Sequence, residues 1–341
     1  MQPRAFITGI SGLELTTDER AFLRETRPWG FILFKRNVEN PAQVARLVQE
    51  LRAAVNRPDA PVLIDQEGGR VQRLGPPHWP AYPSGAVFSA LYDEEADAGL
   101  TAARLSARLI AADLADLGIT VDCLPLADVP VEGADAVIGD RAYGTTPDKV
   151  AAIARAVTQG LEQGGVLPVL KHIPGHGRAT ADSHHRLPTV DTPREDLERS
   201  DFAAFRPLAD LPMAMTAHVV FSAIDPAQPA TTSATMIARV IRDGIGFQGL
   251  LMSDDVSMNA LAGTIAERTA ASVKAGCDVV LHCNGKLDEM RQVAAEVPEL
   301  AGEALARAEA ALASRRPPQA FDRVAARAEL DALTARVRTG A

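Results

Sequence analysis

The chain has 341 residues, of which 47% are hydrophobic and 23% charged, a composition typical of a globular protein with a large core. The formal net charge of −9 and the lack of a long basic patch argue against nucleic acid and anionic membranes as partners. The cysteines, Cys123, Cys277 and Cys283, lack the spacing of a metal site or a disulfide framework, and neither a signal-peptide core nor a run of about eighteen apolar residues is apparent. We therefore expect a cytoplasmic protein of enzyme size.

Short apolar runs typical of strands alternate with segments of helical apolar spacing along most of the chain. The eight strand candidates cover residues 5–10, 30–34, 61–66, 121–127, 166–172, 213–220, 249–254 and 278–283. Helix-start signals stand at residues 17–19, at Asn40-Pro41 and at residues 146–148, in the segments between these strands.

Eight strand–helix units on roughly 300 residues predict a (β/α)8 barrel, the TIM-barrel fold. The alternative is an open doubly wound sheet, but the turn at residues 9–12 lacks the Gly-rich phosphate fingerprint of that fold. Residues 299–341 are rich in Ala and Arg and are predicted to form a helical tail packed on the barrel. No linker or internal repeat divides the sequence, so residues 1–341 are predicted to form a single catalytic domain.

Polar residues stand where several predicted strands end. Asp65 ends the third strand, Lys171 and His172 end the fifth, and Asp254 and Asp255 end the seventh. Barrels carry their active sites at this end of the strands, so these side chains should surround one site. Asp255 has the ordinary explanation of a cap for a helix that begins near residue 256. An unpaired carboxylate is costly at a buried strand end, which favours a functional role for Asp254.

Neighbouring residues on a regular strand point to opposite faces. Lys171 and His172 can therefore both reach one ligand only if the peptide between them is irregular.

The densest group of titratable residues is KHIPGHG at residues 171–177, followed by Asp182-Ser183-His184. Such a density indicates proton transfer or the binding of a polar ligand. In an extended loop, residues two apart point the same way, so Asp182 can accept a hydrogen bond from His184 and orient its ring. His185 is one step out of phase with Asp182. The ordinary alternative is a solvated loop histidine beside an aspartate.

Four separated motifs resemble those of glycoside hydrolase family 3, in its branch of single-domain β-N-acetylhexosaminidases. They are DQEGGRVQR at 65–73, VIGDRAYG at 137–144, KHIPGHG with DSH at 171–184, and GLLMSDDVSM at 249–258. The resemblance implies that Asp254 is the nucleophile, because a carboxylate can form a glycosyl ester that water then cleaves. It further implies that His184 is the acid/base, oriented by Asp182. The sugar contacts that it implies come from Asp65, Arg73, Arg141, Lys171 and His172.

The activity implied by the resemblance is that of a retaining exo-β-N-acetylglucosaminidase. Its substrate would be a GlcNAc-containing muropeptide, GlcNAc-1,6-anhydro-MurNAc, in cell-wall recycling. No cofactor or metal is expected, and the protein is expected to be a monomer or weak dimer.

Within the same family, a β-glucosidase or a glycoside phosphorylase remains possible. A metal-dependent amidohydrolase could draw its ligands from His172, His176, Asp182, His184, His185 and Asp254. The end of the first strand, however, lacks the H-x-H pair of such a site. A sugar-binding barrel without catalysis is the fourth alternative.

Overall fold

The computed structural model describes residues 2–179 and 187–338. A ring of parallel strands lies at its centre, in the order β7-β6-β3-β2-β1-β13-β12-β10-β8. These strands are β1 (Arg4–Thr8), β2 (Pro28–Leu33), β3 (Val62–Ile64), β6 (Val121–Asp122), β7 (Leu167–Pro168), β8 (Leu170–Ile173), β10 (Met213–Thr216), β12 (Leu250–Asp255) and β13 (Val279–His282). Only Val169 separates β7 from β8 along the chain, so the two ends of the sheet meet and close a (β/α)8 barrel.

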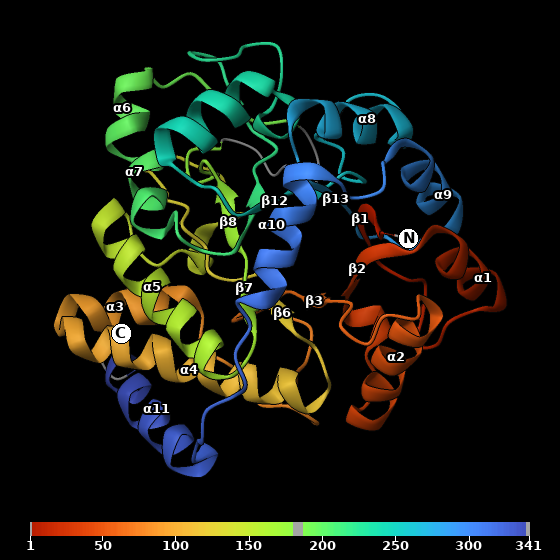
Figure 1. The fold of residues 1–341 in the computed structure, drawn as a ribbon. Coiled ribbons are helices and arrows are strands. Elements are labelled where there is room, and N and C mark those ends of the chain that lie inside the picture. Colours follow the sequence, from red (N-terminus) through yellow and green to blue (C-terminus); the bar gives the residue numbers. More distant parts are fainter. Residues whose placement is uncertain (1, 180–186, 339–341) are drawn as a thin grey trace.

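Helices surround this ring, as Figure 1 shows, and at least one follows each of the eight strand positions. They are α1 (Thr17–Thr26), α2 (Pro41–Ala54), α3 (Gly85–Glu94), α4 (Ala96–Asp116), α5 (Pro147–Gln163), α6 (Arg194–Arg199), α7 (Asp201–Phe205), a π-helix (Met236–Ile245), α8 (Ile265–Ala275) and α9 (Leu287–Glu296). The predicted barrel is therefore confirmed. Two short strand pairs lie outside it: β4 (Gln66–Gly68) with β5 (Val71–Gln72), and β9 (Thr189–Val190) with β11 (Val220–Phe221).

The fourth and fifth strands are less regular than the sequence suggests. The predicted strand at 121–127 is regular only over Val121–Asp122, and the one at 166–172 is divided into β7 and β8. Pro125 and Pro168 lie in these stretches, and a proline has no N–H to donate to a neighbouring strand. The two strands stay paired beyond the break, because Ala127 N–H donates to Lys171 O at 2.7 Å.

The helix starts follow their capping residues. Asn40 caps α2 through its side chain, with Pro41 in the first turn, as predicted. The cap of α1 is Thr16, one residue before the predicted signal, and it forms a capping box with Glu19. The predicted helix near residue 256 is wrong: residues 256–261 form turns, and α8 begins at Ile265 behind the cap of Thr264.

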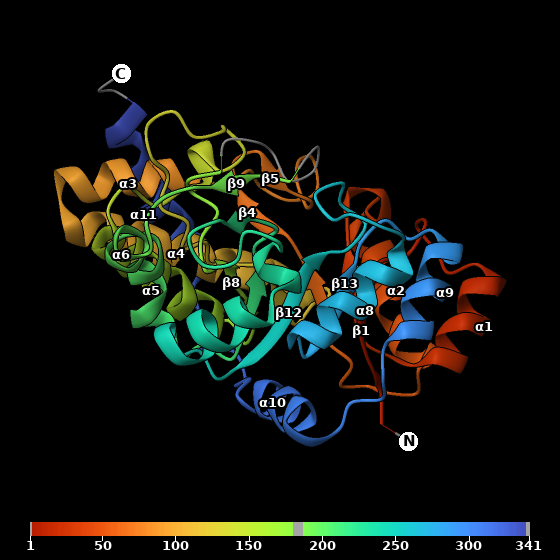
Figure 2. The ribbon, with the colours of Figure 1, turned by 90° about the horizontal axis from the view of Figure 1, so that it is seen from above.

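The C-terminal extension consists of α10 (Gly302–Ala313) and α11 (Arg323–Arg338). Figure 2 shows α10 lying across one end of the barrel. That end is where the strands begin, because Arg307 pairs with Asp278 just before β13, and Arg315 Nε donates to the carbonyl of Gly165 just before β7. Helix α11 packs on α3 and α4. Among the described residues, no helix is long and apolar enough to cross a bilayer.

Candidate active site

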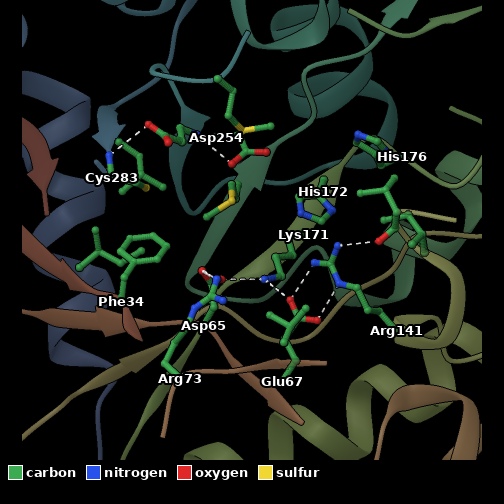
Figure 3. Close-up of a pocket in the computed structure, with 18 of the residues that line it drawn as sticks. Phe34, Asp65, Glu67, Arg73, Arg141, Lys171, His172, His176, Asp254 and Cys283 are labelled. Carbon is green, nitrogen blue, oxygen red and sulfur yellow. Dashed lines mark hydrogen bonds and ion pairs between the residues drawn. The ribbon is translucent and has the colours of Figure 1, made fainter. Parts of the chain in front are cut away.

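A cavity of about 430 Å³ lies at the opposite end of the barrel, where the strands end (Figure 3). All of the predicted site residues that the structure describes line it: Asp65, Arg73, Arg141, Lys171, His172 and Asp254. They come from four separate parts of the chain, and their convergence follows from the closure of the barrel.

A buried cluster of charges forms one wall of the cavity. Lys171 stands at its centre, with Nζ 3.0 Å from Asp65 Oδ1 and 2.6 Å from Glu67 Oε1. Arg73 donates to the other oxygen of Asp65 at 3.1 Å. Arg141 donates to both oxygens of Glu67, each at 2.8 Å, a two-point geometry that favours arginine. Each carboxylate in this wall is thus bound by two cations.

The charges in this wall hold one another in the ionised state. Burial alone would raise the pKa of Asp65, but the charges of Lys171 and Arg73 outweigh it and the pKa is lowered. Glu67 behaves in the same way, with Lys171 and Arg141 lowering its pKa against the effect of burial. Burial would lower the pKa of Lys171, yet the two carboxylates raise it. Neither Asp65 nor Glu67 is therefore a source of protons near neutral pH.

The loop after β3 owes its shape to the side chain of Gln66. Its Oε1 accepts from the backbone N–H groups of Arg73 and Leu74, each at 2.9 Å, and its Nε2 donates to Leu74 O at 2.8 Å. This folds residues 66–74 back on themselves. The guanidinium of Arg73 consequently lies beside Asp65.

The predicted irregularity after Lys171 is present, because the Lys171–His172 peptide is cis and both side chains line the cavity. His172 Nδ1 lies 2.7 Å from Asp128 Oδ2. Asp128 Oδ1 accepts from the backbone N–H of His176 at 2.7 Å. Burial and the nearness of His172 lower the pKa of His176 to about 4, so the His176 ring is neutral near pH 7.

Asp254 and Asp255 end β12 but differ in their surroundings. Asp255 accepts from the backbone N–H and the hydroxyl of Ser257, and from the backbone N–H of Cys283 at 3.1 Å. It therefore stabilises the turn after the strand. Asp254 accepts the N–H of Asp255 at 2.8 Å, and its carboxylate lies on the cavity, across from the charged wall (Figure 3). Asp182 and His184, the predicted dyad, lie outside the described residues, as does His185.

Two residues of the site were not singled out from the sequence. Glu67 lies inside the DQEGGRVQR motif, but its role depends on cations that are distant in sequence. Asp128 follows the predicted strand at 121–127 by one residue, so attention to polar residues just after strands would have found it.

His218, two residues beyond β10, has a structural role. Its ring is buried and hydrogen-bonded to Thr231 Oγ1 at 2.7 Å and to Asp255 O at 3.0 Å. In the described part of the chain, no group of three or more His, Cys, Asp or Glu side chains is placed to hold a metal ion.

Comparison with known proteins agrees with this arrangement. The model of the glycosyl hydrolase family 3 N-terminal domain matches residues 8–314. The beta-hexosaminidase of Alkalilimnicola ehrlichii is 39% identical over 280 residues, which cover 81% of this chain and 79% of that protein. The beta-hexosaminidase of Chromobacterium violaceum is 39% identical over 293 residues, covering 85% of this chain and 81% of that protein.

Among solved structures, NagZ from Neisseria gonorrhoeae in complex with N-trifluoroacetyl-D-glucosamine superposes with a TM-score of 0.85 at 32% identity, covering 99% of this chain and 98% of that one. A family 3 beta-N-acetylglucosaminidase from a Paenibacillus strain has a TM-score of 0.78 at 32% identity, covering 99% of this chain and 62% of that one. The protein is thus a sugar-cleaving barrel enzyme. The chain belongs to glycoside hydrolase family 3, and within that family it is of the beta-hexosaminidase type.

Proposed function

We propose that this enzyme is a retaining exo-β-N-acetylglucosaminidase that removes a terminal GlcNAc by way of a covalent glycosyl-enzyme intermediate. Asp254 attacks the anomeric carbon, and His184, oriented by Asp182, first protonates the leaving oxygen and then activates water. The observation that carries the proposal is that the Asp254 carboxylate faces the charged wall of Asp65 and Lys171 across one cavity.

The charged wall suits the binding of a sugar ring. Asp65 can accept hydrogen bonds from two sugar hydroxyls, while Arg73 and Lys171 can donate to sugar oxygens. Their geometry is set before any sugar arrives, because each is already tied to a partner of opposite charge. Arg141 and His172 extend the polar lining, and a cavity of about 430 Å³ lies in the range of small-ligand sites.

The state of the other carboxylates supports a histidine as the acid/base. Most glycosidases use a second carboxyl group in this role. In this cavity, cations lower the pKa values of Asp65 and Glu67, so neither holds a proton to give. Asp255 is bonded within its turn. The proton for the leaving oxygen then comes from a group other than these three carboxylates, and the family resemblance assigns that role to His184.

The proposed natural substrate is GlcNAc-1,6-anhydro-MurNAc and its peptide-bearing forms, in cytoplasmic cell-wall recycling. This part rests on the family resemblance alone. The complex of the Neisseria protein with N-trifluoroacetyl-D-glucosamine is consistent with an N-acylated glucosamine at the non-reducing end.

The activity is tested with p-nitrophenyl β-GlcNAc and p-nitrophenyl β-glucoside, each with and without inorganic phosphate. We expect rapid release from the GlcNAc substrate and little from the glucoside, with no acceleration by phosphate. Preference for the glucoside would identify a β-glucosidase, and a sugar 1-phosphate product would identify a phosphorylase. A 5-fluoro derivative of GlcNAc, which slows hydrolysis of the intermediate, should label the peptide that contains Asp254.

A further inference from the structure

Asp128 is a fully buried carboxylate that the proposed chemistry does not use. Among the described residues it makes three hydrogen bonds, two to His172 within β8 and one to His176 just after that strand. Its Oδ1 accepts from the backbone N–H groups of His172 at 3.3 Å and His176 at 2.7 Å, and its Oδ2 lies 2.7 Å from His172 Nδ1. The first two contacts shape the backbone, whereas the third reaches a ring that lines the sugar cavity.

The third contact determines which nitrogen of His172 carries a proton. Burial alone would raise the pKa of Asp128, but its pairing and hydrogen bond with His172 lower it, so the group is a carboxylate. A carboxylate can only accept hydrogen bonds, and therefore the His172 proton must lie on Nδ1. This leaves Nε2, on the far side of the ring, as the nitrogen available to a ligand.

We propose that Asp128 is a positioning residue that acts through His172, fixing its ring orientation and its Nδ1–H tautomer so that Nε2 is presented to the sugar. In the neutral ring, Nε2 then accepts a hydrogen bond from a sugar hydroxyl. The cavity wall beside it already supplies cationic donors in Lys171 and Arg141. A sugar hydroxyl that accepts a hydrogen bond from one of these cations can at the same time donate one to Nε2. The two hydrogen bonds together fix the orientation of the hydroxyl.

The substitution Asp128→Asn reverses this arrangement with little change in shape. The amide oxygen is needed by the two backbone N–H groups, so the amide NH₂ must face His172 Nδ1. That NH₂ donates, and Nδ1 must then accept. The ring takes the Nε2–H tautomer and offers a donor where the native enzyme offers an acceptor.

The tautomer is measured directly by the ¹⁵N shifts of the histidine rings in labelled protein, with the His172 signals assigned through His172→Gln. We expect Nδ1 to be protonated in the native enzyme and unprotonated in Asp128→Asn. An Nδ1 that bears no proton in the native enzyme, or one that keeps its proton in the variant, overturns the proposal. This measurement needs no substrate and is independent of the proposed function.

The activity test rests on the proposed function and uses a double-mutant cycle with p-nitrophenyl β-GlcNAc. Asp128→Asn should lower kcat/KM about 10- to 100-fold, mainly through KM, which is the effect of one mispaired hydrogen bond in a site. In a His172→Ala background, the same change should cost less than about threefold, because the residue that transmits it is gone. An undiminished loss in that background would show that Asp128 serves only the backbone.

Asp122 provides a matched control. It is also fully buried, at the end of β6, and its Oδ1 accepts from Gln66 N–H at 3.0 Å. Burial raises the pKa of Asp122 well above the usual value. In the described part of the chain, its side chain forms no hydrogen bond with a histidine. Asp122→Asn should leave the His172 shifts in place. If it changes them as much as Asp128→Asn does, the effect is a general disturbance of the barrel end.

Discussion

Glu67 and Arg141 lie 74 residues apart in the sequence and form a two-point ion pair, with Arg141 Nε and Nη2 each 2.8 Å from a Glu67 oxygen. Their side chains are only 5% and 11% exposed. The pair joins the loop after β3 to the loop after β6, and Lys171 from β8 completes it. Three barrel positions are thereby held together on one side of the cavity.

Glu67→Gln should therefore weaken both the fold and the site. The change removes the charge that two buried cations share, and breaking a buried pair costs about 3 kcal/mol. We expect a matching loss in the free energy of unfolding, measured by urea denaturation, and a higher KM for p-nitrophenyl β-GlcNAc. Asp140→Asn is the control, because the Arg70–Asp140 pair is 47% exposed on both sides and should contribute less than about 1 kcal/mol. Similar small losses in both variants would contradict the role given to Glu67.

Asp254→Ala should remain folded and lose several orders of magnitude in kcat, because the attacking carboxylate is gone. External azide should partly restore turnover and give a product of inverted configuration. Circular dichroism checks the fold, and NMR of the azide product checks the configuration. Asp255→Ala is the matched neighbour and should lose stability more than chemistry, since Asp255 stabilises its turn. A near-normal rate in Asp254→Ala together with an inactive Asp255→Ala would identify Asp255, and not Asp254, as the nucleophile.

His184→Ala should discriminate between leaving groups. An activated aryl glycoside needs little protonation of its leaving oxygen, so the variant should keep much of its activity there and lose more on a natural disaccharide. Rates on both substrates, compared with those of His185→Ala, provide the test. Equal losses on the two substrates would speak against His184 as the acid/base, and His185→Ala should be mild on either.

His176 should make the free energy of unfolding depend on pH in the mildly acidic range. Its pKa in the folded protein is about 4, below the ordinary histidine value of 6.5, so between these pH values the unfolded chain binds a proton that the folded protein does not. Stability therefore falls as pH drops from about 6.5 to about 4, by roughly 3 kcal/mol at most from this residue. In urea denaturation across this range, His176→Gln should show a smaller fall than the native enzyme. His78→Gln, at an exposed position, should change nothing, and a native-like fall in His176→Gln would refute the assignment.

The alternation of apolar runs was sufficient to predict the barrel, because strand and helix periodicities are local properties of the sequence. Asp65, Lys171 and Asp254 could be placed at the same end for a similar reason: each stands at the end of a predicted strand, and parallel strands of a barrel all end on one side. The irregular peptide at Lys171–His172 was also predicted, from the need of two adjacent side chains to reach one ligand. The roles of Asp182 and His184 remain predictions.

Only the tertiary structure decided which charges meet. Lys171 and Asp65 are 106 residues apart, and no local pattern indicates that they lie 3.0 Å from each other. The pairing of Asp128 with the His172 ring depends likewise on β8 running beside the segment after β6, past the prolines that interrupt both strands. Side-chain identity and spacing determine which groups stand at a strand end. Their ionisation states and hydrogen-bond roles depend on partners that only the closed barrel brings within reach.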